Sequence, residues 1–250
     1  MKKYLQSVLG VFLACLILAS PTLAAEGHHW GYTGEFSPEN WHKSDPSFGL
    51  CQEGKNQTPI DIKPHYDVAL PALNLLYAHK GESILNNGHT IQVPFPSGNS
   101  LTVTGDKAYS LLQVHFHSPS ENTLNGESFP MEAHFVHKDN DGNLLVLAVF
   151  FKEGEANPGI AALWKNMPQA ANQTAKLSQA FDPMSILPSS MDYIYFNGSL
   201  TTPPCSEGVR WCVLKTPLTV SKEQAEALLK IMKGPNNRPL QPANARPVLQ

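Results

Sequence analysis

Short apolar runs follow one another along most of the chain, separated by turns rich in glycine, proline, asparagine and aspartate. Such short runs between turn residues are typical of strands rather than helices. The clearest runs are residues 91–93, 111–116, 131–136 and 144–151. Residues 139–143, Asp-Asn-Asp-Gly-Asn, separate the last two runs and predict a hairpin turn. The pattern therefore predicts a domain dominated by a β-sheet.

Two stretches have a helical pattern instead. The first covers about residues 159–166. The second covers residues 221–233. Ser221 and Gln224 predict a capping box at its start, and the Gly-Pro pair that follows predicts its end. No repeat, linker or change in composition divides the chain after its N-terminal segment. We therefore expect a single mixed, mainly β domain with short peripheral helices.

The N-terminal segment has the pattern of a secretory signal peptide. Lys2 and Lys3 precede an apolar stretch over residues 8–19, and small residues follow as far as Ala25. We expect cleavage after Ala24 or Ala25, which gives a signal peptide over residues 1–24 and a domain over residues 25–250. The protein is then periplasmic or secreted, with no membrane span after processing.

Two other interpretations of this segment remain open. The apolar stretch is short for a membrane span, but an uncleaved N-terminal anchor is one alternative. Residues 12–15, Phe-Leu-Ala-Cys, form a weak match to a lipoprotein signal, because more apolar residues follow the cysteine directly.

Composition narrows the function classes. The 250 residues carry a formal charge of −3, and loss of Lys2 and Lys3 makes it −5. A net negative chain is poorly suited to neutralise phosphates, so we expect no nucleic-acid partner. Cleavage also removes one of four cysteines, leaving Cys51, Cys205 and Cys212. An oxidising compartment favours a disulfide, but spacing does not choose among the three pairings.

The strongest chemical pattern is a pair of histidines in one predicted strand. Alternate side chains of a strand share a face, so Gln113, His115 and His117 project together. In a second predicted strand, Glu132 and His134 share a face in the same way.

If these two strands are neighbours, three imidazole nitrogens converge on one point. Three histidines leave the fourth tetrahedral position of zinc open, which is the arrangement of a catalytic site. Gln113 and Glu132 then stand where the ligands need hydrogen-bond partners. The alternative is a set of partly buried, hydrogen-bonded strand histidines without a metal. His137 points to the opposite face, and we interpret it as structural.

Across nearly the whole chain after the N-terminal segment, the ordered motifs resemble the alpha class of carbonic anhydrases. The matching motifs are residues 28–32 (His-His-Trp-Gly-Tyr), 56–62 (Asn-Gln-Thr-Pro-Ile-Asp-Ile), 86–89 (Asn-Asn-Gly-His), 113–117 (Gln-Val-His-Phe-His), 119–121 (Pro-Ser-Glu), 132–134 (Glu-Ala-His), 197–205 (Asn-Gly-Ser-Leu-Thr-Thr-Pro-Pro-Cys) and 237–242 (Asn-Arg-Pro-Leu-Gln-Pro). The resemblance implies a central, twisted, mostly antiparallel sheet of about ten strands with short helices outside. It places a zinc site on the middle strands, at the base of a conical cleft.

The resemblance also implies an activity, the reversible hydration of CO2 to bicarbonate and a proton. One Zn²⁺ per chain, held by His115, His117 and His134, would supply a bound hydroxide that attacks CO2. Thr201 matches the residue that orients this hydroxide by donating its own proton to Glu121. Anions and sulfonamide-type compounds are the inhibitors that this family implies, and a homodimer is possible.

Further positions match substrate and proton-transfer residues of the family. An apolar wall for CO2 corresponds to Val136, Val146, Leu200 and Trp211, with Thr202 on the bicarbonate side; spacing alone cannot distinguish these from ordinary core residues. His89 matches the proton shuttle, and Tyr32, Asn87 and Gln92 match residues that order the intervening water. Cys51 and Cys205 match a disulfide pair, which leaves Cys212 as a buried, small apolar residue.

Rival functions come from other classes. Residues 115–121 match the short ligand spacing of a cupin metalloenzyme, but Tyr109 and Ser128 replace the flanking glycines of that motif. An inactive binding module or a periplasmic zinc carrier is the non-enzyme alternative, although the three zinc histidines are all present. A zinc protease is excluded because the chain has no His-Glu-x-x-His motif.

Overall fold

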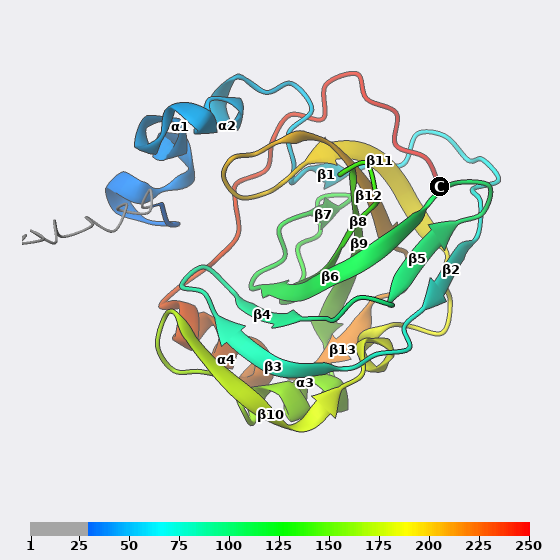
Figure 1. The fold of residues 1–250 in the computed structure, drawn as a ribbon. Helices are drawn as coiled ribbons and strands as arrows, with labels where there is room; N and C mark the ends of the chain where they lie inside the picture. The colour runs from blue at the N-terminus through cyan, green and yellow to red at the C-terminus, as the bar shows by residue number, and fades with distance from the viewer. Residues whose placement is uncertain (1–29) are drawn as a thin grey trace, which may run out of the picture.

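A twisted sheet of 11 strands forms the centre of the molecule (Figure 1). The computed structural model describes residues 30–250. The expected signal peptide and its cleavage positions lie outside these residues. The main path of the sheet runs β10 (Gln173–Phe181), β3 (Gly81–Asn86), β4 (Ile91–Pro94), β6 (Ala108–His117), β8 (Met131–Lys138), β9 (Leu144–Glu153), β12 (Glu207–Leu214) and β11 (Tyr193–Ser199).

Three short strands complete the sheet. β13 (Leu218–Val220) pairs with β9, and β5 (Ser100–Val103) joins β2 (Leu73–Leu76) to β6. β9 pairs in parallel with β12 and β13, and the other pairs in this sheet are antiparallel. A separate parallel pair consists of β1 (Asp61–Ile62) and β7 (Thr123–Leu124). The expected mainly β, mostly antiparallel fold is confirmed.

The middle strands are buried on both faces, and each face packs into its own core cluster. The larger cluster receives Ala133 and Phe135 of β8 together with Leu145 and Leu147 of β9. The smaller cluster receives the side chains that alternate with these, among them Val136. Because successive strand residues point to opposite faces, one sequence fills both clusters.

The predicted hairpin and helices are present. Asp139 closes the β8–β9 turn, since its Oδ1 accepts from the backbone N–H groups of Asp141 (2.9 Å) and Asn143 (2.8 Å). The helix expected near residues 159–166 is α3 (Pro158–Trp164), and the capped helix is α4 (Lys222–Met232). The capping box of Ser221 and Gln224 is present at the start of α4.

The remaining helices are short. α1 (Trp41–Ser44) and α2 (Leu50–Glu53) stand to one side of the strands (Figure 1). Single 3-10 turns cover Gly34–Phe36, Pro38–Asn40, Pro46–Phe48 and Pro183–Ile186. Within residues 30–250, no helix is long and apolar enough to cross a membrane.

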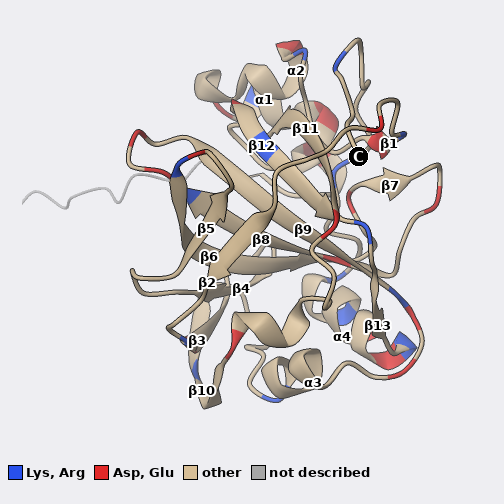
Figure 2. Ribbon diagram, turned by 90° about the vertical axis from the view of Figure 1, so that its right-hand side faces the viewer, with Lys and Arg blue, Asp and Glu red and all other residues tan. Residues whose placement is uncertain are grey.

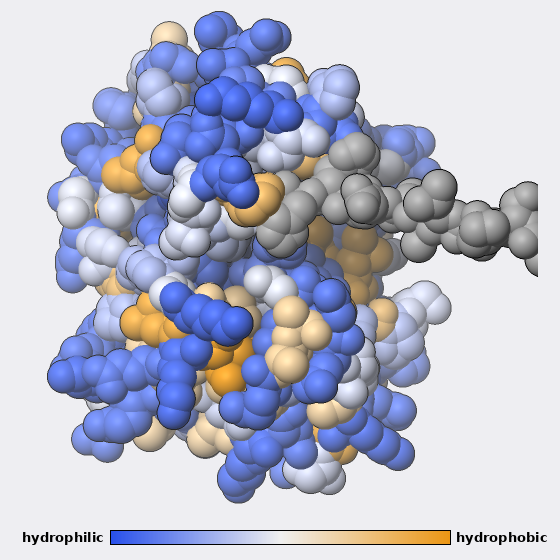
Figure 3. Space-filling view, turned by 90° about the vertical axis from the view of Figure 1, so that its left-hand side faces the viewer, coloured by the Kyte–Doolittle hydropathy of each residue, from blue (hydrophilic) through white to orange (hydrophobic). Residues whose placement is uncertain are grey.

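Charge and hydropathy follow this architecture. Charged residues lie mainly on loops and helices around a largely uncharged sheet (Figure 2). On the face in Figure 3, hydrophobic residues form separate patches among polar ones. Most of the apolar side chains are therefore used to fill the two clusters on either side of the sheet.

Candidate metal centre

Three histidines from two neighbouring strands converge at the centre of the sheet. The antiparallel register of β6 and β8 sets His115 opposite His134, and His117 opposite Glu132. The candidate ligand nitrogens of His115, His117 and His134 all lie within 4.8 Å of one another. The condition set by the sequence, that the two strands be neighbours, is thus met.

Two of the rings have the partners that strand periodicity predicts. Nδ1 of His115 lies 2.9 Å from Oε1 of Gln113, in hydrogen-bond geometry. Nε2 of His134 lies 2.9 Å from Oε1 of Glu132. The hydrogen bond to Gln113 leaves Nε2 of His115 for a metal. Nε2 of His134 lies beside the Glu132 carboxylate without meeting hydrogen-bond geometry, and this placement leaves Nδ1 of His134 for a metal.

The partner of the third ring was not predicted from the sequence. Nδ1 of His117 lies 2.7 Å from the backbone carbonyl oxygen of Asn236, which follows α4. The opposite nitrogen, Nε2, is buried and has no hydrogen-bond partner within residues 30–250. An unpartnered buried nitrogen is costly unless something binds it, and a metal ion would do so.

The chemistry of the donor set fits zinc. Burial and the neighbouring imidazoles lower the pKa of His115 and of His134 well below the ordinary 6.5, and burial lowers the pKa of His117. Lowered pKa values keep the rings neutral, which is the form that binds metal. Three neutral imidazole nitrogens suit zinc and leave its fourth position open.

Glu121 connects the histidines to Thr201. Its Oε2 lies 3.4 Å from Nε2 of His117 and 3.9 Å from Nδ1 of His134. The carboxylate is fully buried, interacts with the Thr201 side chain, and accepts a hydrogen bond at Oε1 from the Arg238 backbone N–H at 2.9 Å. Burial raises the pKa of Glu121 to about 8, and a nearby divalent cation would favour the ionised form.

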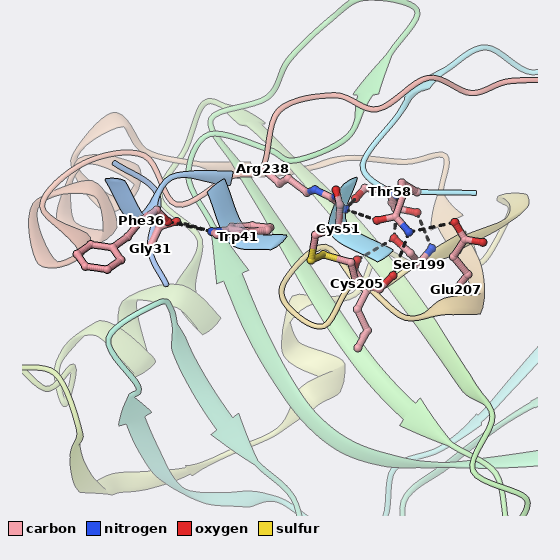
Figure 4. The surroundings of a disulfide bond; sticks show 11 residues. Gly31, Phe36, Trp41, Cys51, Thr58, Ser199, Cys205, Glu207 and Arg238 are labelled. Carbon is pink, nitrogen blue, oxygen red and sulfur yellow. Dashed lines mark hydrogen bonds between the residues drawn. A yellow bond between two sulfur atoms is a disulfide. The ribbon is translucent and has the colours of Figure 1, made fainter. Parts of the chain in front are cut away.

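A disulfide holds the loop that carries Thr201 (Figure 4). Cys205 is bonded to Cys51 of α2, and its N–H donates to the carbonyl of Thr202 at 2.9 Å. The Arg238 guanidinium donates to the carbonyl of Cys51 at 2.8 Å. The expected Cys51–Cys205 pair is confirmed, and Cys212 is buried and forms no disulfide.

A pocket of about 100 Å³ opens beside the histidines. Its walls bring together the four residues expected for proton transfer, Tyr32, Asn87, His89 and Gln92, with Thr202 and the candidate ligands His115 and His117. The imidazole of His89 stacks on the indole of Trp30, with ring centroids 3.6 Å apart and an angle of 7° between the planes.

The apolar residues expected at the CO2 site lie together in the smaller core cluster. Val136 faces Val146 across the β8–β9 pair, and Leu200 packs against the same cluster. The ring of Trp211 meets that of His134 edge-on, with centroids 4.9 Å apart. This apolar cluster therefore borders the metal centre at His134.

Comparison with known proteins agrees with this arrangement. Residues 36–250 match the family model described as eukaryotic-type carbonic anhydrase. A carbonic anhydrase of Neisseria gonorrhoeae is 47% identical over 242 residues, which cover 95% of each chain.

Solved structures agree as well. The alpha-carbonic anhydrase of Thermovibrio ammonificans, in complex with the inhibitor sulfanilamide, superposes with a TM-score of 0.87 at 46% identity, covering 90% of this chain and 100% of that one. The Photobacterium profundum alpha-carbonic anhydrase gives 0.84 at 48% identity, with 89% and 100% covered. The chain therefore belongs to the eukaryotic-type, or alpha-class, family of carbonic anhydrases, which are lyases.

Proposed function

We propose that the chain catalyses the reversible hydration of CO2 to bicarbonate and a proton, with one zinc ion on His115, His117 and His134. The observation that carries this proposal is the convergence of their nitrogens within 4.8 Å, while the other nitrogen of each ring lies 2.7–2.9 Å from an oxygen of Gln113, Asn236 or Glu132. Zinc bound there would lower the pKa of a coordinated water from 15.7 to near 7 and so supply a nucleophile at neutral pH.

Thr201 and Glu121 orient the reacting groups. A carboxylate accepts hydrogen bonds and cannot donate them, so the Thr201 hydroxyl is the donor in its interaction with Glu121. Its oxygen is then left to accept a hydrogen bond from a ligand that carries a proton. This directionality favours a hydroxyl-bearing ligand over one without a proton. The backbone N–H of Thr201 and the side chain of Thr202 contact the substrate oxygens in this scheme.

The apolar wall of Val136, Val146, Leu200 and Trp211 binds CO2, which is small and nonpolar. Contact of Trp211 with the His134 ring supports this assignment, because it places the wall directly against a ligand. On the polar side of the pocket, His89 receives the released proton through water ordered by Tyr32, Asn87 and Gln92. An unperturbed imidazole titrates near 6.5, which suits such a relay.

Location and inhibition are part of the same proposal. We place the protein in the periplasm or outside the cell, with residues 1–24 removed and 25–250 as the enzyme domain. The Cys51–Cys205 disulfide supports this, since such bonds persist in oxidising compartments. Sulfonamide-type and anionic inhibitors would compete at the metal centre. The sulfanilamide complex of the Thermovibrio ammonificans relative supports the first of these two classes.

Stopped-flow CO2 hydration of the wild type beside His117→Ala, each with measured zinc content, tests the proposal. We expect one zinc per chain and rapid hydration for the wild type, and loss of both in the variant. Stoichiometric zinc without hydration would contradict the enzyme and favour a zinc carrier. Bound iron or manganese in place of zinc would favour cupin-like chemistry.

A further inference from the structure

Asn236 is a buried residue whose side-chain amide joins two segments that lie far apart in the sequence. Its exposed fraction is 1%. Oδ1 accepts from the Ser118 N–H at 2.8 Å, at the end of β6. Nδ2 donates to the carbonyls of Phe116 at 3.0 Å and of His89 at 3.1 Å. Both N–H groups and the oxygen of the amide are therefore in use.

The turn that carries His89 is held from two sides. Oδ1 of Asn87 accepts from the backbone N–H groups of His89 (2.9 Å) and Thr90 (2.8 Å). Gly88, between them, has a φ of +88°, a conformation that glycine adopts without strain. The Asn87 side chain thus binds the N–H of His89, and the Asn236 side chain binds its carbonyl. These two contacts fix the backbone from which the imidazole projects.

The same amide also connects the His89 turn to the strand that carries two of the candidate metal ligands. Phe116, whose carbonyl accepts from Asn236, lies between His115 and His117 on β6. The backbone carbonyl oxygen of Asn236 is the hydrogen-bond partner of Nδ1 of His117. One residue therefore sets the distance between the His89 turn and the strand that bears two of the three ligands.

We propose that the Asn236 side-chain amide is a positioning group for proton transfer, because it fixes the His89 turn relative to the metal centre. The inference rests on the proposed function, in which His89 carries the proton. A relay through ordered water depends on where the imidazole stands, and misplacement by about 1 Å can cost about 100-fold in rate.

Asn236→Asp is a sharp test because it is nearly isosteric. Aspartate keeps the oxygen that accepts from Ser118, and the backbone carbonyl that meets His117 is unchanged. It replaces the N–H groups that donate to His89 and Phe116 with an acceptor. At low buffer concentration we expect kcat for CO2 hydration to fall by about tenfold, which is less than the loss of about 100-fold for a displacement of about 1 Å. Added imidazole should restore kcat. We expect kcat/KM for CO2 to change by less than about twofold, since the proton leaves after the hydration steps.

Asn99→Asp is the matched control. Asn99 is fully buried, and its amide binds both the N–H (2.7 Å) and the carbonyl (2.8 Å) of His79, away from the pocket residues. Asn99→Asp removes one hydrogen bond from a side-chain amide to the carbonyl of a histidine, His79, that has no role in the proposed reaction. We expect lower stability and an unchanged dependence on buffer.

Amide hydrogen exchange gives a readout that is separate from activity. The His89 and Thr90 amides should exchange faster in Asn236→Asp, and not in Asn99→Asp. If both amides stay protected and kcat is unchanged, the inference is wrong. If kcat and kcat/KM fall together and imidazole restores neither, Asn236 acts through His117 alone and the inference is also wrong.

His89→Ala, measured in parallel, separates the two proposals. Loss and rescue in His89→Ala without any in Asn236→Asp would overturn the positioning role and leave the shuttle in place. No loss in His89→Ala would overturn both. In the double variant, the Asn236 change should have no further effect on buffer-limited kcat. If Asn236→Asp does not fold, Asn236→Ala, which has no side-chain donor for either carbonyl, serves for the same comparison.

Discussion

On β8, His134 and His137 stand three residues apart on opposite faces of the sheet, and both are almost fully buried. His134 lies among two other histidines, with ring centroids 5.1 Å from His115 and 4.7 Å from His117. His137 lies on the side of the sheet that packs into the larger core cluster. There, its Nε2 is 2.7 Å from the hydroxyl of Tyr77, and its Nδ1 is 3.3 Å from the backbone carbonyl oxygen of Leu145.

Burial is common to both rings, so it does not distinguish them. It lowers the pKa of His134 well below its ordinary value and that of His137 to about 4, which leaves both neutral. The difference is that both nitrogens of His137 have hydrogen-bond partners within the protein. His134 has Glu132 at one nitrogen and turns the other toward His115 and His117. A buried histidine thus becomes a ligand when a nitrogen is left over and other donors converge on it.

The largest expected effect is the difference in zinc content and CO2 hydration between a variant of His134 and the same variant of His137. His134→Gln should lose zinc and lower CO2 hydration by at least about 1,000-fold, because water without the metal keeps its pKa near 15.7. His137→Gln should retain zinc and hydrate CO2 within about threefold of wild type, at a cost in stability of about 1–3 kcal/mol. Zinc content and stopped-flow assays on both variants check this. Equal loss of zinc in the two would remove the distinction between the faces.

A second large effect concerns Val136, which shares the metal-side face of β8. Val136→Tyr should fill the space where CO2 approaches and lower hydration by at least about 100-fold, with zinc content unchanged. Val136→Ala keeps the space open and serves as the control. Full hydration by the tyrosine variant would show that CO2 binds elsewhere.

The partners of the two rings allow a finer test. Glu132→Gln weakens the contact to His134, and loss of such a partner typically lowers metal affinity by about 10–100-fold. Tyr77→Phe removes the hydroxyl next to His137 and should cost about 1–3 kcal/mol of stability with no change in zinc affinity. Competition with a zinc chelator measures the affinities. Similar affinity losses in both variants would argue against the distinction.

Strand periodicity places the candidate ligands and two of their partners on common faces, but it does not predict the groups that come from distant segments. A period of two places Gln113 on the same face as His115, and Glu132 on the same face as His134. Asn236 contacts His117, and Arg238 contacts Glu121, through backbone groups from a segment more than a hundred residues away, so strand periodicity does not reveal these contacts. The pairing of β6 with β8 is likewise a tertiary contact, which the sequence supports only as a condition.

Helix ends show the same limit on a smaller scale. The pattern extends the first helix to about residue 166, whereas α3 ends at Trp164. The capped start of α4 was predicted correctly, because Ser221 and Gln224 satisfy each other's backbone groups locally. A helix end can therefore be predicted from the sequence where both hydrogen-bonding residues lie within one helical turn.

The smallest expected effect is a pH dependence of stability that belongs to His137 alone. Its pKa in the folded protein is about 4, against 6.5 for an ordinary histidine. Between these values the unfolded chain binds a proton that the folded protein does not, so stability falls as the pH falls. Above 6.5 the ring is neutral in both states and has no effect. From pH 6.5 to about pH 5 the loss is on the order of 2 kcal/mol.

Urea unfolding of wild type and His137→Gln across this range isolates the contribution of His137. The zinc-free protein is the right sample, because zinc ligands must lose protons to bind and would add their own pH dependence. His115, His117 and His134 titrate in both proteins, so their effects cancel in the difference. The wild type should lose its stability relative to His137→Gln as the pH falls. Parallel curves would mean that His137 binds a proton as readily in the folded protein as in the unfolded chain, and the lowered pKa of His137 would then be wrong.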